Sequence, residues 1–386
     1  MTKRPSFLML IATSSFEMDD RLRKECESIR DHLGDVSVVG FESEVSKARR
    51  GEISPGVPFT GLAHHSKARF RPGKGLPVKA METAWRLVLQ IVRRRPDVVW
   101  LHDPPFWPVV WLSLLLRRIG MINHVVWDLH ELIPDSELRG RFSGLIRRCL
   151  EGVDLLIMTN QWRAEHLRET LLFEPRHLIL LENYPSAEVL TRSSCDLPAE
   201  VEKWLRGRPF ILGQGAAGQD RNFPQLRAAV ETTGIPMVVI GRKPEGLRPD
   251  LFYCTGWIPQ DEIYPYLNRA DLSVILYERG NPNAWFCSPN RLFQAIVRGC
   301  PVLGGSNPPI ARVLAQFDVG HVVAGDGSNP HELVRGIELA LARRDRLRRP
   351  AEEVQGEFIW EHQFERALPS IQRALPAGSP AAGSRR

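Results

Sequence analysis

The sequence predicts an α/β protein with two doubly wound parallel sheets. Short, continuously apolar runs alternate with amphipathic stretches along the chain. Parallel strands that are covered by helices on both faces produce this pattern. The pattern restarts after residue 208, and a chain of 386 residues suits two domains, since a domain usually takes about 100–200 residues.

In the first half, apolar runs predict strands and stretches of helical periodicity predict helices. Strands are expected at 6–14, 36–41, 97–101, 124–129 and 153–159. Helices are expected at 20–32, 77–94, 105–119 and 137–151. The segment 56–75 carries several Gly, Pro and basic residues, and we expect it to form a mobile loop.

In the second half, the same criteria predict strands at 208–213, 237–241, 251–256, 270–276 and 300–305. Helices are expected at 224–232, 260–268 and 289–298. We predict domains at 1–190 and 191–350, a helix at 351–375 that crosses back to the first domain, and a disordered tail at 376–386. Ligands of such sheets bind beyond the carboxyl ends of the strands, so the cleft between the two domains is the expected site.

The composition narrows the class of protein. A hydrophobic fraction of 43% and a charged fraction of 25% are ordinary for a globular protein. The net charge of +6 suits an anionic ligand or membrane surface but is too small to indicate nucleic acid binding. The six cysteines form no CxxC pair, which predicts free thiols and no metal site. The longest apolar stretch, 106–116, is too short to span a membrane, so we expect a cytoplasmic protein.

The segment 213–218 reads GQGAAG, a literal GxGxxG after a predicted strand. In the dinucleotide-binding motif, the third glycine already lies in the following helix. Here QDRNFP intervenes, and Asn222 with Pro224 has the pattern of a helix start. A nicotinamide cofactor is therefore disfavoured. Gly213 and Gly215 still allow a ligand to approach the backbone, and Arg221 adds positive charge; an ordinary turn beside a surface arginine is the alternative.

The segment 288–303 reads SPNRLFQAIVRGCPVL. Ser288 can cap a helix whose first position is Pro289. The exposed N–H groups of such a helix, with Arg291, can bind an anion, and Gln294 can hydrogen-bond a sugar hydroxyl. A well-capped core helix is the alternative interpretation.

These residues resemble a known family. The segment SPNRLFQAIVRGCPVL resembles PNKLFEYMAAGKPVV of the GT-B-fold glycosyltransferases, in particular glycosyltransferase family 4 (group 1). Four further segments resemble the same family in the same order: SSFEMDDRLRKECESI, WLHDPP, NHVVWDLHEL and TGWIPQDEIYPYLNRADLSVILY. The resemblance runs from about residue 5 to 345. It implies two Rossmann-like domains that face each other across a cleft, with the nucleotide sugar on the second domain and the acceptor on the first.

The resemblance also implies roles for individual residues of the second domain. Gly213, Gly215, Arg221 and Arg291 would serve the donor diphosphate, with Ser288 and Asn290 beside them, and the backbone of Ile258 would meet the base. Gln294 stands where the family has the glutamate that binds ribose, and Phe286 replaces the other glutamate of the family's EX7E pattern. The chain contains no DxD triplet, which disfavours a metal-dependent transferase, so we expect no metal and no cofactor besides the nucleotide sugar.

In the first domain, Asp103, His130 and Glu131 follow predicted strands and are the catalytic candidates. Helix capping is the alternative role for Asp103, and a polar turn is the alternative for His130. If transfer retains the anomeric configuration, as in family 4, the donor phosphate can accept the proton and no protein base is needed.

A basic segment completes the analysis. Residues 67–95 contain nine Lys or Arg and one acidic residue, Glu82, and Arg139, Arg141, Arg147 and Arg148 form a second cluster. Both could attract anionic lipid head groups, and solvated helix faces are the alternative. The function predicted is transfer of a sugar to a lipid-linked saccharide of surface polysaccharide synthesis or to a small-molecule aglycone, without nucleic acid. A nucleotide-sugar epimerase of the same fold and a non-catalytic binding protein are the other two hypotheses.

Overall fold

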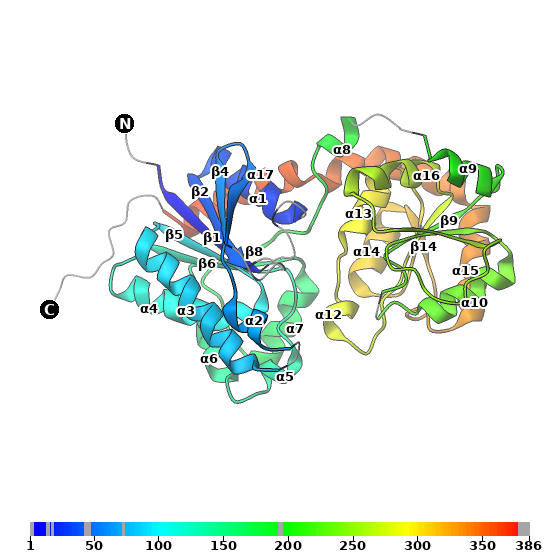
Figure 1. Cartoon of the computed structure of the whole chain (residues 1–386). Helices are drawn as coiled ribbons and strands as arrows, with labels where there is room; N and C mark the ends of the chain where they lie inside the picture. The colour runs from blue at the N-terminus through cyan, green and yellow to red at the C-terminus, as the bar shows by residue number, and fades with distance from the viewer. Residues whose placement is uncertain are drawn as a thin grey trace. The chain divides into compact units, whose positions relative to one another are not determined.

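The chain folds into two compact units in a computed structural model, shown in Figure 1. Unit 1 contains residues up to Leu181 and from Phe364 onward, and unit 2 contains Glu182–Gln363. The structure describes residues 4–12, 16, 19–41, 48–71, 74–191, 196–218 and 220–376. The tail predicted to be disordered therefore lies almost entirely outside the described residues. In the described part of the chain, no helix is both long enough and apolar enough to cross a membrane.

Unit 1 contains an eight-stranded sheet with the order β3-β4-β2-β1-β5-β6-β7-β8. All neighbours are parallel except β3 and β4. The strands are β1 (Ser6–Ala12), β2 (Asp35–Phe41), β3 (Arg49–Ser54), β4 (Val57–Gly61), β5 (Val98–His102), β6 (His124–Leu129), β7 (Leu155–Met158) and β8 (Leu178–Leu180).

The helices of unit 1 cover both faces of this sheet. They are α1 (Asp20–His32), α2 (His65–Arg69), α3 (Leu76–Arg94), α4 (Trp107–Arg118), α5 (Asp135–Leu138), α6 (Ser143–Gly152) and α7 (Gln161–Leu171), with a 3₁₀ turn η2 (Pro104–Phe106) before α4. Helix α4 packs between α3 and α6, and these three gather on the side of the sheet opposite α1 (Figure 1). The last helix, α17 (Trp360–Ala374), joins unit 1 from Phe364 onward.

Unit 2 contains a parallel six-stranded sheet with the order β11-β10-β9-β12-β13-β14. The strands are β9 (Ile211–Gln214), β10 (Met237–Ile240), β11 (Phe252–Gly256), β12 (Leu272–Ile275), β13 (Val302–Gly304) and β14 (Gly320–Val322). The helices are α8 (Glu188–Thr191), α9 (Ala199–Leu205), α10 (Phe223–Thr233), α11 (Tyr264–Arg269), α12 (Pro282–Trp285), α13 (Asn290–Val297), α14 (Pro308–Phe317), α15 (Pro330–Ala342) and α16 (Arg344–Val354), with 3₁₀ turns η3 (Gln260–Ile263) and η4 (Gln355–Phe358).

Both faces of this second sheet are buried in apolar cores. Leu212 and Val238 point into one core, whereas their neighbours Ile211 and Val239 point into the other. Successive side chains of a strand alternate between faces, so a strand that is buried on both faces must be apolar throughout. This explains why the continuous apolar runs predicted the parallel sheets correctly.

The prediction of a mobile loop at 56–75 was wrong. This segment contains β4 and α2, and β4 pairs with β2 and with the preceding strand β3. Gly56, at φ +79°, makes the turn between β3 and β4, since glycine adopts positive φ at little cost. The Gly and Pro residues thus mark a hairpin rather than an unstructured loop.

Candidate functional site

Two polar clusters stand at the carboxyl ends of the parallel strands, one in each unit. In unit 1, His102 ends β5, and Asp128 and His130 stand at the end of β6. Helix α1 contributes Arg21 and Glu25, which lie one turn apart. All of these side chains are buried except that of His130, which is 19% exposed.

Arg21 holds the centre of this unit 1 cluster. Its Nη2 lies 3.1 and 3.2 Å from the two carboxylate oxygens of Asp128 and 2.9 Å from Glu25 Oε1. Burial disfavours the charged form of Asp128, but Arg21 and the two histidines hold its pKa well below the ordinary value. Burial and the neighbouring Asp128 raise the pKa of Glu25 well above its ordinary value. Asp128 is therefore the ionised partner of Arg21, whereas the charged form of Glu25 is disfavoured.

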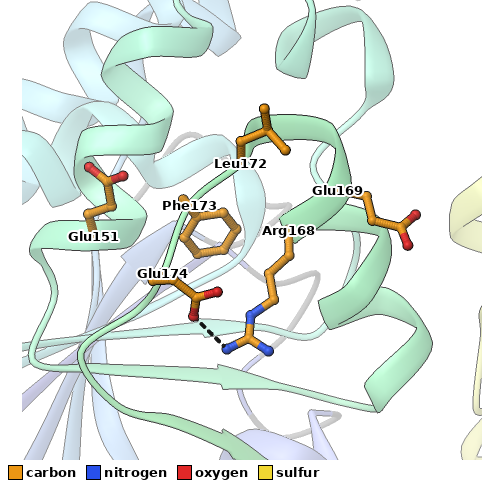
Figure 2. Close-up of a pocket in the computed structure, with 6 residues that line it drawn as sticks. All are labelled: Glu151, Arg168, Glu169, Leu172, Phe173 and Glu174. Carbon is orange, nitrogen blue, oxygen red and sulfur yellow. Dashed lines mark hydrogen bonds and ion pairs between the residues drawn. The ribbon is translucent and has the colours of Figure 1, made fainter.

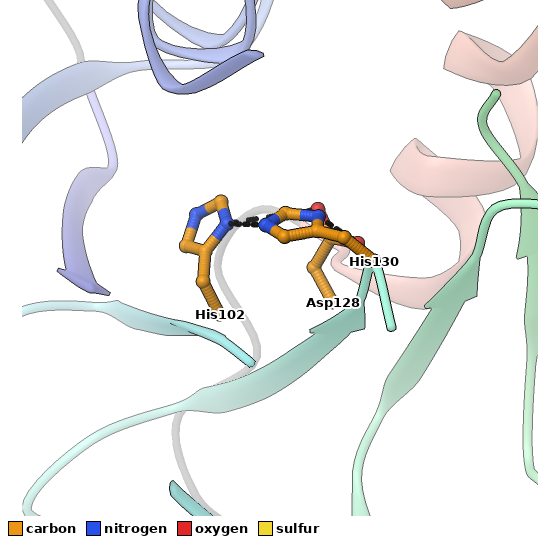
Figure 3. Close-up of side chains that lie close together, drawn as sticks. All are labelled: His102, Asp128 and His130. Atoms are coloured by element: carbon orange, nitrogen blue, oxygen red, sulfur yellow. Dashed lines mark hydrogen bonds and ion pairs between the residues drawn. The ribbon is translucent and has the colours of Figure 1, made fainter. Parts of the chain in front are cut away.

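The two histidines bond to each other, as Figure 3 shows. His102 Nδ1 lies 2.9 Å from His130 Nε2, and His130 Nδ1 lies 3.3 Å from Asp128 Oδ1. Burial and the neighbouring His130 keep the pKa of His102 well below its ordinary value, so His102 is neutral. Each ring nitrogen of His130 thus faces a protein group. The carbonyl of His130 accepts a hydrogen bond from the buried Arg163.

The same three residues are the group in the described chain whose ligand atoms lie close enough to hold a metal ion. One atom each of His102, Asp128 and His130 fall within 4.8 Å of one another. However, the guanidinium of Arg21 already contacts both oxygens of Asp128, and a cation would have to displace it. The arrangement is therefore better suited to fix the tautomer and orientation of a histidine pair than to bind a metal.

Asp103 occupies a strained position beside this cluster. Its backbone has φ +72° and ψ +146°, a region that a residue with a Cβ rarely adopts. Two hydrogen bonds hold the backbone of Asp103 in this conformation. Its N–H donates to the Asp128 carbonyl, and its carbonyl accepts from Trp127 Nε1. Its side chain caps no helix, which removes the alternative role for Asp103. Burial raises the pKa of this carboxyl to about 6. Glu131, the third catalytic candidate, is exposed.

In unit 2, two arginines meet at the end of β9. Arg221 Nη1 donates to the Gly215 carbonyl over 2.8 Å, and Arg291 Nη1 donates to the Gln214 carbonyl over 2.6 Å. Both guanidinium groups lie over the ring of Tyr277, at 5.1 and 4.9 Å from its centroid. Gly215 has φ +60°, and a Cβ there would lie 3.0 Å from Arg221 Nη1, so glycine is favoured at this position.

The charge of Arg291 has no carboxylate to balance it. Its side chain is buried, and its Nε and Nη2 have no hydrogen-bond acceptor among the described residues. Burial, and to a lesser degree the nearby Arg221, lower its pKa. No ion pair joins either arginine to an acidic side chain in the described part of the chain. A buried cation without a counter-charge is costly, so this pair is suited to receive an anion.

The other predicted donor residues lie on several elements of unit 2. Gln294 accepts a hydrogen bond from Gln214 Nε2 over 3.1 Å, while Gln214 Oε1 is buried with no donor among the described residues. Asn290 begins α13, and Ile258 is half-buried after the end of β11. Gly213 lies in β9, and the third glycine of the GxGxxG segment, Gly218, lies in the turn before α10. The third glycine therefore precedes the helix, as the sequence predicted, and the absence of a nicotinamide cofactor stays a prediction.

The prediction that Ser288 caps α13 was wrong. The residue before the helix is Pro289, and no side chain accepts a hydrogen bond there. Ser288 is instead buried and hydrogen-bonded to Glu182, where it helps to stabilise that buried carboxylate. Pro289 occupies the position before the helix, so Ser288 lies one residue too far from it to cap it.

Four members of the unit 1 cluster were not among the predicted site residues: Arg21, Glu25, His102 and Asp128. Arg21 and Glu25 lie beside the buried apolar residues of α1, and His102 is the last residue of β5. The i, i+4 spacing of Arg21 and Glu25 beside the buried Leu22 and Cys26 was the signal that could have found them.

A hollow of about 560 Å³ on unit 1 lies apart from both clusters (Figure 2). It is lined by Glu151, Arg168, Glu169, Leu172, Phe173 and Glu174. Arg168 pairs with Glu174 across it over 3.1 Å. Helix α7 begins at the carboxyl end of β7 and reaches this hollow only at its last turn. The hollow is therefore at the opposite edge of the sheet from His130.

Comparison with known proteins agrees with the two-sheet architecture. Residues 18–183 match the model of the glycosyl transferase 4-like domain. No curated protein matches the sequence. The fold is similar to that of sucrose-phosphate synthase from Thermosynechococcus elongatus, with a TM-score of 0.76 and 14% identity over 97% of this chain and 100% of that one. It is also similar to the catalytic domain of starch synthase IV from Arabidopsis thaliana bound to ADP and acarbose, with a TM-score of 0.69 and 12% identity over 97% of this chain and 100% of that one.

A third similar structure is a trehalose-phosphate synthase from Burkholderia xenovorans in complex with glucose-6-phosphate. Its TM-score is 0.71, with 12% identity over 96% of this chain and 100% of that one. The chain thus has the GT-B fold, with two Rossmann-like units. Residues 18–183 thus match a glycosyltransferase domain, and the whole chain has a fold similar to that of GT-B glycosyltransferases.

Proposed function

We propose that the chain transfers a sugar from a nucleotide-diphosphate sugar to an acceptor, without a metal and with retention of the anomeric configuration. The acceptor would be a lipid-linked saccharide of surface polysaccharide synthesis or a small-molecule aglycone. Unit 2 would bind the donor, and unit 1 the acceptor. The observation that carries this proposal is the pair of guanidinium groups, Arg221 and Arg291, at the end of β9 with no carboxylate partner.

The chemistry of this pair suits a departing diphosphate. When the bond between the sugar carbon and the diphosphate breaks, negative charge develops on the leaving oxygen. Two arginines held by backbone carbonyls are already oriented, and Arg291 is also buried, so they can stabilise this charge without a divalent cation. Tyr277 keeps both guanidinium groups in place, and burial raises the pKa of its phenol to about 12, so it remains a neutral platform.

The unit 1 cluster supports a role in holding the acceptor. In a retaining transfer, the acceptor oxygen attacks the face from which the diphosphate leaves, and its proton passes to a phosphate oxygen. His130, Asp103 and Glu131 would then orient the acceptor and the sugar. Asp103 has a carboxyl with a pKa near 6, and it could take the proton if the reaction were inverting.

The proposed acceptor determines where in the cell the enzyme would work. A lipid-linked saccharide requires the enzyme to work at a membrane surface, and the basic residues between 67 and 95 would favour an anionic one. We propose a cytoplasmic enzyme that is peripheral at the inner face of the membrane.

The test is a thermal-shift screen with UDP, GDP, dTDP, ADP and CMP, in the presence of EDTA, with NAD and NADP as controls. A ligand at about 100 times its Kd stabilises the folded state by about 2.7 kcal/mol, which is easily measured. We expect one nucleoside diphosphate to raise the melting temperature. Stabilisation by NAD or NADP alone would refute the proposal.

Two other functions remain as hypotheses, because Phe286 and Gln294 replace the two glutamates of the family pattern. An epimerase would turn over the nucleotide sugar without an acceptor. A non-catalytic protein would bind the donor without turnover. If the proposed roles are correct, His130→Ala lowers the rate of transfer and leaves donor binding unchanged, whereas a wild-type rate would remove His130 from the catalytic set.

A further inference from the structure

Gln214, the last residue of β9, contacts two side chains of helix α13. Its backbone carbonyl accepts a hydrogen bond from Arg291 Nη1 over 2.6 Å, and its side-chain Nε2 donates to Gln294 Oε1 over 3.1 Å. Gln214 is half-buried, whereas Arg291 and Gln294 are buried. Gln214 therefore joins a guanidinium group that is suited to an anion to a second amide group on the same helix.

The two amide groups use only part of their hydrogen-bonding capacity on each other. Each amide has one carbonyl oxygen and one NH2 group, so a single bond between them leaves one oxygen and one NH2 group over. Gln214 Oε1 is buried and has no donor among the described residues. Gln294 Nε2 donates to none of the described residues either. A buried acceptor without a donor destabilises a protein, and a ligand hydroxyl at this place would remove that penalty.

The amide pair lies next to the anion-binding groups. Arg291 and Gln294 are three residues apart on α13, so their side chains lie on the same face of the helix. Both face the carboxyl end of β9, since each is bonded to Gln214. Ligands of parallel sheets bind at this edge. A ligand there would meet the guanidinium donors and, beside them, one amide oxygen and one NH2 group.

This combination of groups selects among anionic ligands. The oxygens of pyrophosphate are mainly acceptors, so pyrophosphate would bond to the arginines and leave Gln214 Oε1 without a donor. A ribonucleoside diphosphate also has two neighbouring hydroxyls, and each hydroxyl can both donate and accept. One can donate to Gln214 Oε1 while the other accepts from Gln294 Nε2. A 2′-deoxyribose has a single hydroxyl and would leave one of these two groups without a partner.

We propose that Gln214 and Gln294 together bind the two ribose hydroxyls of the donor nucleotide, so that the donor sugar is linked to a ribonucleoside diphosphate and not to a 2′-deoxyribonucleoside diphosphate. The inference rests on the proposed function, because it concerns the donor of that reaction. It adds Gln214 as a residue that determines specificity, since a site built to hydrogen-bond a hydroxyl rejects the analogue that lacks it.

The amide pair also gives the glutamine at position 294 a physical reason, where the family resemblance implies a glutamate. A carboxylate supplies acceptors only and brings a negative charge. The amide pair supplies one acceptor and one donor and brings no charge. The guanidinium groups of Arg221 and Arg291 therefore keep their full charge for the diphosphate.

The experiment is calorimetric titration of the full chain with matched nucleotides that differ only in the 2′-hydroxyl. The pairs are UDP with dUDP, GDP with dGDP, and ADP with dADP, and inorganic pyrophosphate measures the arginines alone. We expect the ribonucleotide of the preferred base to bind about tenfold more tightly than its 2′-deoxy analogue, because one hydrogen bond is lost.

Substitutions at Gln214 test whether this residue causes the difference. Gln214→Met removes the amide and should lower the ribose-to-deoxyribose ratio to about one, with pyrophosphate affinity unchanged. Gln214→Glu keeps an acceptor oxygen and should retain a ratio of about fivefold or more, while its negative charge beside Arg291 lowers the affinity for pyrophosphate. The matched control is Gln316→Met at an exposed position of α14, which should change neither quantity.

Three results would overturn the inference and leave the proposed function standing: equal affinity of the wild type for both members of every pair, dTDP as the tightest ligand, or an unchanged ratio in Gln214→Met. In each of them the chain still binds a nucleoside diphosphate. If the wild type bound neither nucleotides nor pyrophosphate, the proposed function itself would fail, and the inference with it. Normal binding of pyrophosphate by Gln214→Met shows that this variant is folded.

Discussion

In unit 1 the buried Arg21 meets two carboxyl groups, whereas in unit 2 the buried Arg291 meets a second arginine. In the first cluster, the guanidinium of Arg21 lies against the carboxylate of Asp128, so the two charges balance. In the second, no ion pair joins Arg291 to a carboxylate among the described residues, and its Nε and Nη2 have no acceptor there. A buried cluster whose charges balance stabilises the fold and orients its own residues. A buried cluster with unbalanced positive charge is suited to bind an anionic ligand. Three substitutions test this difference.

The largest expected effect is on the balanced cluster. Arg21→Met leaves Asp128 buried without its cation, and the loss of one partner from a buried pair costs about 3–5 kcal/mol. Urea denaturation would measure the free energy of unfolding. The control is Arg23→Met on the same helix, where two partly exposed ion pairs are lost and the cost should stay below about 1 kcal/mol. Equal costs for the two variants would contradict the central role of Arg21.

The second substitution addresses the unbalanced cluster. Arg291→Met removes a buried charge that no carboxylate balances, so the melting temperature should not fall. The affinity for the nucleoside diphosphate should fall about 10–150-fold, since a hydrogen bond to a charged group contributes about 1.5–3 kcal/mol. Calorimetric titration would measure it, with Arg335→Met on the surface of α15 as the control. If Arg291→Met lowered the free energy of unfolding as much as Arg21→Met does, the two clusters would not differ in charge balance as described.

The smallest expected effect is at Asp103, where strain and burial act together. The folded state raises the pKa of this carboxyl to about 6, above the ordinary 3.8, so its ionisation costs stability as the pH rises from about 4 to 6. Asp103→Asn removes this cost and keeps the size of the side chain. We expect a gain of about 1–2 kcal/mol above pH 6 that shrinks toward pH 4, measured by denaturation across this range. A gain independent of pH would mean that backbone strain alone is responsible.

The sequence predicted most of the parallel strands, because burial on both faces leaves a continuous apolar signal. It did not predict the helices α7, α14 and α15. It missed the edge strands β3, β8 and β14 and also β4, which lies between β3 and β2. These strands are short, and β3 is exposed and polar, so pairing with a neighbour defines them rather than any local pattern. The catalytic candidates Asp103 and His130 were found because they directly follow strands, although their roles stay predictions.

What the sequence alone determined is the alternation of strands and helices, the position of polar residues at strand ends, and the departures at Phe286 and Gln294. The tertiary structure decided which charges meet. Arg21 and Asp128 are separated by 107 positions, and Arg221 and Arg291 by 70, so no local pattern could join them. Only packing shows that one arginine has a counter-charge and the other has none, since the cost of a buried charge depends on all the groups around it.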